Sequence, residues 1–123
     1  MPNKIMVVDD EENLLILLKS LLESHGFDAV TMKNGMECLD AIEREKPDLL
    51  ILDVMMPEMN GLDVAGKIRA NPKTKKTMII FLTVLGSKEI NHKTLRELKA
   101  IDYITKPFDN EDLIRRVKWA ISK

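Results

Sequence analysis

Five short apolar runs alternate with five amphipathic stretches along the chain, and this alternation restricts the fold more than any other feature of the sequence. The runs predict strands at residues 5–8, 29–32, 49–52, 78–82 and 103–104. Three of them are continuously apolar, which is typical of parallel strands that are covered on both faces. We therefore expect an α/β fold of the (βα)5 type: a doubly wound, five-stranded parallel sheet with helices on both faces.

Apolar residues at helical spacing predict the helices between these strands. The first helix has apolar residues at positions i, i+3, i+4 and i+7, which predicts one buried face. The residues of this face are Leu14, Leu17, Leu18 and Leu21. The later helices are marked by Leu39 with Ile42, by Leu62 with Ala65 and Ile68, by the segment 90–98, and by Leu113 with Val117, Ala120 and Ile121.

Turn and cap residues support these boundaries. Gly26 follows the first helix, where a residue in the left-handed conformation is expected. The pair Asn34-Gly35 separates the second strand from its helix. Asn110 is predicted to cap the last helix, with Asp112 as the acid of its first turn.

Size and composition limit the class of protein. A chain of 123 residues forms one domain, so residues 1–123 are expected to be a single unit. Nineteen basic and 20 acidic residues give a net charge of -1, which predicts no general attraction to nucleic acid or to anionic membranes. The single Cys38 excludes an internal disulfide and is predicted to be buried. Without a membrane-spanning run or a signal-peptide core, the expected location is the cytoplasm.

Polar side chains follow the predicted strands at the edge where such sheets bind ligands. They are Asp9, Asp10, Asp53, Thr83 and Lys106. Three carboxylates packed together repel one another unless a cation neutralises them, and Mg2+ is the hard cation that favours such oxygen ligands. Asp9 and Asp10 alone also fit an acidic helix start, and it is Asp53, after the most apolar strand, that favours a site.

The same segments carry a resemblance to a known family. They are Val7–Asp10, Leu52–Pro57 with Asn60-Gly61, Thr83, and Tyr103–Phe108. In order and spacing they resemble response-regulator receiver domains of the chemotaxis-regulator type, over essentially the whole chain. The resemblance implies a flavodoxin-like fold and a stand-alone module of two-component signal transduction.

The resemblance also implies roles for single residues. Asp53 would accept the phosphoryl group. Asp10 and Asp53 would bind Mg2+ with the backbone carbonyl of Met55, and Asp9 would act mostly through water. Two further residues, Thr83 and Lys106, would bind the phosphoryl oxygens. Tyr103 would be the switch aromatic, and the Lys106-Pro107 bond, typically cis in the family, would aim the lysine inward.

The implied function is Mg2+-dependent transfer of a phosphoryl group to Asp53 from a histidine kinase or phosphotransfer protein. The product would switch the surface of the fourth helix, fifth strand and fifth helix, which would then bind a separate output protein. Such a protein catalyses only its own phosphorylation and slow autodephosphorylation. Onward transfer to a histidine-bearing relay protein is an alternative, and a monomer and a phosphorylation-dependent dimer are both open.

Three positions depart from the family pattern. Val84 stands where a very small residue is usual, and Met55 offers no hydrogen bond to an attacking water. Both are expected to restrict access to Asp53 and to slow loss of the phosphoryl group. Lys99 stands near the end of the fourth helix without the frequent glycine, so a left-handed conformation there would cost stability.

Two surface features bear on partners. Trp119 lies nearly opposite the apolar stripe of the last helix and is expected to be exposed, either for partner contact or for partial packing on a loop. The basic run of Arg115, Arg116 and Lys118 fits a solvated helix end, or pairing with acids such as Asp102 across a dimer contact.

Other functions fit the sequence less well. A Mg2+-dependent aspartyl phosphatase on a related fold needs Asp-x-Asp after the first strand, whereas this chain has adjacent Asp9 and Asp10. In a flavodoxin-like electron carrier the first loop offers hydroxyls and amides to a phosphate, which these carboxylates would repel. A degenerate receiver that only binds a partner would not need all five polar groups.

Overall fold

The computed structural model describes residues 2–84 and 91–122, and in these residues one parallel sheet has the strand order β2-β1-β3-β4-β5. The strands are β1 (Lys4–Val8), β2 (Asp28–Met32), β3 (Leu49–Asp53), β4 (Met78–Val84) and β5 (Asp102–Lys106). The helices are α1 (Glu12–Ser24), α2 (Gly35–Glu45), α3 (Gly61–Ala70), α4 (His92–Glu97) and α5 (Asn110–Ile121).

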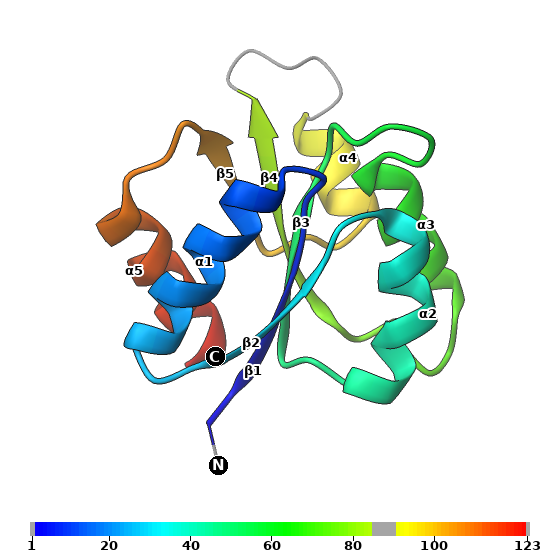
Figure 1. Cartoon of the computed structure of the whole chain (residues 1–123). Coiled ribbons are helices and arrows are strands. Elements are labelled where there is room, and N and C mark those ends of the chain that lie inside the picture. The colour runs from blue at the N-terminus through cyan, green and yellow to red at the C-terminus, as the bar shows by residue number, and fades with distance from the viewer. Residues whose placement is uncertain (1, 85–90, 123) are drawn as a thin grey trace.

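The helices form one layer on each face of the sheet. Helices α1 and α5 cover one face, and α2, α3 and α4 cover the other (Figure 1). This confirms the predicted doubly wound, flavodoxin-like (βα)5 fold. The chain order reverses between β1 and β3, which are neighbours in the sheet, and in such sheets this is where ligands bind beyond the carboxyl ends of the strands.

Strand β3 shows how the sequence builds two cores from one strand. Its residues are fully buried and alternate between the faces: Leu49 and Ile51 join the core under α1 and α5. Leu50 and Leu52 join the core under α2 and α3. Each such side chain contributes about 1.5–3 kcal/mol by leaving water, so β3 holds its terminal residue, Asp53, on a rigid support.

The predicted buried face of α1 was correct in part, and Leu17 was wrongly included. Leu15, Leu18 and Leu22 are the buried residues, whereas Leu17 is 46% exposed. Leu14 and Leu21 are partly buried at the edges of the contact. The helix is so rich in leucine that two overlapping stripes satisfy the same periodicity, and only packing against the sheet selects between them.

Three further boundary predictions can be compared with the structure. Asp109, and not Asn110, caps α5, and its carboxylate accepts a hydrogen bond from the backbone N–H of Glu111 at 3.1 Å. Both residue types cap well, but Asp109 has the extended backbone that the cap requires. The left-handed residue after α1 is Gly26, as predicted. Segment 90–98 contains α4, and residue 90 lies outside the described residues.

Helix α4 is followed by a left-handed residue that is not glycine, which is the conformation expected to cost stability. Lys99 has φ 56°, and its N–H donates to the carbonyl of Arg96 at 3.2 Å. The N–H of Ala100 donates to the carbonyl of Leu95 at 3.0 Å. This pair of bonds is the Schellman arrangement, in which glycine is usual at the position that Lys99 holds.

Two expectations, on the burial of Cys38 and on membrane-spanning helices, can be checked in the same way. Cys38 is fully buried, as predicted, and burial raises the pKa of its thiol to about 12. Within residues 2–84 and 91–122, none of the helices is long and apolar enough to cross a membrane.

Candidate functional site

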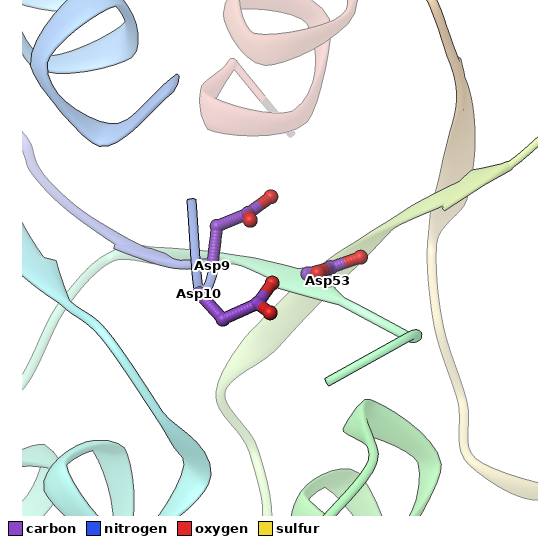
Figure 2. A group of neighbouring side chains, drawn as sticks. All are labelled: Asp9, Asp10 and Asp53. Carbon is purple, nitrogen blue, oxygen red and sulfur yellow. The ribbon is translucent and has the colours of Figure 1, made fainter. Parts of the chain in front are cut away.

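Three carboxylates gather at the carboxyl ends of β1 and β3. Asp9 and Asp10 follow β1, and Asp53 ends β3, the strand hydrogen-bonded beside it. One oxygen from each carboxylate lies within 4.8 Å of the other two, and Figure 2 shows the three side chains side by side. Asp9 and Asp53 are buried while Asp10 is exposed, so the cluster opens to solvent at Asp10.

Lys106 joins this cluster from the last residue of β5. Its Nζ lies 2.8 Å from Oδ2 of Asp9 and 3.3 Å from Oδ1 of Asp53. The Lys106-Pro107 peptide bond is cis, as predicted. Burial alone would lower the pKa of Lys106, but its hydrogen bond to Asp9 and the charges of Asp53 and Asp9 raise the pKa, so the side chain is a cation.

The two oxygens of Asp53 have different surroundings. Oδ1 lies beside Lys106 and accepts a hydrogen bond from the backbone N–H of Met55 at 3.3 Å. Oδ2 is the buried side-chain oxygen that has no hydrogen-bond partner among the described residues. Burial, and after it the charge of Asp9, raises the pKa of Asp53 to about 6 although Lys106 opposes the change.

These observations fit a divalent cation. Three carboxylates against one ammonium leave two negative charges uncompensated when all groups are ionised. The orphaned Oδ2 of Asp53 needs an electrophilic neighbour to offset its burial. Oxygen-only donors of this kind suit Mg2+. The structure thus brings together all four of the predicted charged residues.

Thr83 and Tyr103 lie on the same face of neighbouring strands. In the register of β4 and β5, Phe81 faces Tyr103 and Thr83 faces Thr105, so the alternation of strands puts all four on one side of the sheet. The buried hydroxyl of Thr83 lies 3.5 Å from the carbonyl of Val84, which is a weak contact. Tyr103, on the edge strand, is 38% exposed.

The residues predicted to restrict access are half exposed. Val84 at the end of β4 is 50% exposed, and Met55 after β3 is 49% exposed. Their effect on the lifetime of a phosphoryl group stays a prediction. Trp119 on α5 is also 49% exposed, which agrees with the exposure expected for it.

Arg116, in the basic run on α5, forms ion pairs within its own chain. Nη1 of Arg116 lies 2.8 Å from both oxygens of Asp102 in the same chain, and Nε lies 3.0 Å from Asp112. Arg116 reaches Asp102 because α5 packs beside the edge strand β5. The pair that was expected across a dimer contact is therefore formed within one chain.

Sequence reasoning missed two contributors to the site. The backbone N–H of Glu11 donates to Oδ1 of Asp9 at 2.9 Å, which orients that carboxylate. Gly61 begins α3 so close to β3 that a Cβ would lie 2.1 Å from the backbone oxygen of Asp53. The Asn60-Gly61 pair signals a turn and helix start, but no sequence signal shows what the glycine approaches.

The comparisons with known proteins agree with this geometry. Residues 5–118 match the family described as the response regulator receiver domain. The chemotaxis protein CheY4 of Vibrio cholerae has the same fold, with a TM-score of 0.89 and 27% identity over 98% of this chain and 99% of that one. A CheY-like receiver domain protein of Methanospirillum hungatei has a TM-score of 0.85 and 33% identity, over 98% of this chain and 94% of that one.

Two curated relatives are longer proteins. The alkaline phosphatase synthesis transcriptional regulatory protein PhoP of Bacillus subtilis is 43% identical over 96% of this chain and 48% of its own length. The transcriptional regulatory protein CpxR of Escherichia coli is 42% identical over 94% of this chain and 48% of its own length. The chain thus spans about half the length of these relatives, and the expected absence of nucleic-acid contact stays a prediction.

The family match covers nearly the whole chain, and the sheet and the acidic cluster agree with it. The chain belongs to the response regulator receiver domains, the phosphorylation-signalling domains of two-component systems.

Proposed function

We propose that residues 1–123 act as one receiver module in which Asp53 accepts a phosphoryl group in a Mg2+-dependent reaction. The observation that carries this proposal is the buried Oδ2 of Asp53, which has no hydrogen-bond partner among the described residues although it lies beside two carboxylates and a lysine. The donor is a histidine kinase or phosphotransfer protein. The domain's location is the cytoplasm.

The reaction forms an O–P bond at Asp53 and breaks the P–N bond of the donor phosphohistidine. The leaving imidazole takes up a proton, and the product is an aspartyl phosphate. Asp53 must be ionised to attack, and with its pKa raised to about 6 by burial it is an anion at neutral pH. A carboxylate that approaches an anionic phosphoryl group needs compensating positive charge in the transition state.

The residues of the cluster divide this task. Lys106, already 3.3 Å from Asp53, supplies one fixed positive charge beside the attacking carboxylate. Asp10, Asp53 and the backbone carbonyl of Met55 would hold Mg2+, with Asp9 acting mostly through water. The bound ion would neutralise charge on the phosphoryl oxygens. Asp9 also fixes Lys106 through their 2.8 Å hydrogen bond.

The proposed response starts at Thr83. Among the described residues its hydroxyl makes only a weak contact, so a phosphoryl oxygen on Asp53 is a better partner for it. Movement of Thr83 toward that oxygen frees space on the face that it shares with Tyr103. Inward rotation of Tyr103 then changes the surface of α4, β5 and α5, where an output partner binds.

Phosphorylation is tested with acetyl phosphate and intact mass measurement, with and without Mg2+. We expect one added phosphoryl group with Mg2+, little without it, and none in Asp53→Asn. A phosphoryl group that appears in the Asp53→Asn protein contradicts the assignment.

The switch is tested with beryllofluoride, which mimics an acyl phosphate. Trp119, the single tryptophan, reports on the end of α5. We expect its fluorescence to change in the wild type and to change much less in Thr83→Ala, whereas both proteins bind the mimic. An equal change in both proteins contradicts the role of Thr83.

A further inference from the structure

A basic cavity lies at the opposite end of the sheet from the acidic cluster. It has a volume of about 490 Å3 and is lined by Met78 and Ile101 together with four cationic residues. The cationic residues are Arg69, Lys75, Lys76 and Lys99, and we call this cavity the basic pocket. Met78 begins β4 and Thr83 is near its end, so these two residues are about 17 Å apart along the strand.

Arg69 ties together the two loops that form the basic pocket. Its Nη1 donates to the carbonyls of Lys75 and Thr77, each at 2.7 Å, in the connection before β4. Its Nε and Nη2 donate to the carbonyls of Leu98 and Lys99, at 2.7 and 3.2 Å, at the end of α4. The guanidinium therefore fixes the backbones from which two of the lysines project, so part of the ordering cost of a site is already met.

The basic pocket carries excess positive charge. Among the described residues, Glu97 is the one acid in its lining, and this side chain already pairs with Lys93 at 3.9 Å. In the part of the chain that the structure describes, no carboxylate lies within 4.0 Å of Arg69 or of the three lysines. Four cations against one acid leave about three positive charges around a cavity of ligand size.

We propose that the basic pocket binds a small organic diphosphate. A diphosphate group carries about three negative charges, which matches the excess of the lining. Inorganic phosphate alone fills little of a 490 Å3 cavity, whereas Met78 and Ile101 provide an apolar wall for an organic part. Lysine ammonium groups on two clamped loops suit such a ligand because each holds a phosphate as a point charge.

The proposal is tested by titration of the full 15N-labelled chain with ADP, pyrophosphate, inorganic phosphate and adenosine. The buffer contains EDTA so that no Mg2+ recruits phosphate to Asp53. We expect saturable amide shifts at residues 75–78 and 97–101 with ADP, and weaker binding of each of the other three ligands. In Lys75→Ala/Lys76→Ala we expect the Kd for ADP to rise at least about tenfold.

The matched control is Lys33→Ala/Lys118→Ala, which removes two exposed lysines elsewhere and should leave the Kd within about twofold. Equal weakening in both double variants would show general charge attraction and overturn the proposal. So would shifts confined to the surroundings of Asp53 and Lys106, or the lack of saturation below about 10 mM. A short DNA duplex that binds more tightly than ADP at the same amides would reassign the basic pocket to nucleic acid.

Discussion

Asp53 is an ionisable residue at the end of a fully buried strand, and its protonation is coupled to folding. Its pKa of about 6 in the folded protein is higher than that of an unfolded aspartate, so the folded state binds a proton more tightly between pH 4 and 6. The free energy of unfolding therefore falls as the pH rises through this window.

We predict that in EDTA the wild type loses about 2 kcal/mol of stability between pH 4 and pH 7 relative to Asp53→Asn. The asparagine has no charge to desolvate beside Asp9. Urea unfolding of both proteins across the pH range measures the difference. Parallel stability curves would show that the burial of Asp53 does not cause the pH dependence of the free energy of unfolding.

The residues near Asp53 lead to a second prediction. We expect Val84→Ala and Met55→Asn each to speed loss of the phosphoryl group, by about tenfold or 1.4 kcal/mol of barrier. A smaller side chain at position 84 admits water, and an amide at position 55 gives it a hydrogen bond. Release of inorganic phosphate from the phosphorylated chain is the measurement. Unchanged rates in both variants would reject the proposed role of these side chains.

At the scale of elements, the start of α3 is fixed by its contact with the end of β3. We predict that Gly61→Ala costs at least about 2 kcal/mol and impairs phosphorylation, because its Cβ would overlap the backbone oxygen of Asp53. Gly66→Ala in the same helix is the control, since a Cβ there meets nothing within 4 Å. This control should gain about 0.5–1 kcal/mol in unfolding measurements. Similar effects of the two substitutions would refute the contact argument.

The end of α4 depends on Arg69 and on the conformation of Lys99. We predict that Arg69→Met costs about 2–4 kcal/mol, because four carbonyls lose a charged donor. Lys99→Gly should instead add about 1 kcal/mol by relieving the left-handed residue. Thermal or urea unfolding gives both values. If Lys99→Gly is destabilised, the side chain of Lys99 contributes more stability than its left-handed backbone costs.

For the whole molecule, the sequence was enough to predict the fold and the four charged residues that meet at the candidate site. The apolar runs locate the strands, and parallel strands bring residues such as Asp9, Asp53 and Lys106 to one edge whatever the details of packing. Choices that depend on packing were not accessible: which stripe of α1 is buried, and what Gly61 approaches. The Arg69 contacts join residues 29 and 30 positions apart, so no local pattern reveals them.

The place of β5 at the border of the sheet has a mechanical consequence. Asp9 and Asp10 follow β1 and Asp53 ends β3, and both strands are hydrogen-bonded to neighbours on two sides. Tyr103 belongs to β5, which in the described part of the chain is bonded to β4 alone. Displacing a border strand disrupts one ladder of backbone bonds, and displacing a central strand disrupts two. Reversible motion therefore costs least free energy in an edge strand such as β5. A chemical change at the rigid centre of the sheet can thus alter the conformation of its flexible edge.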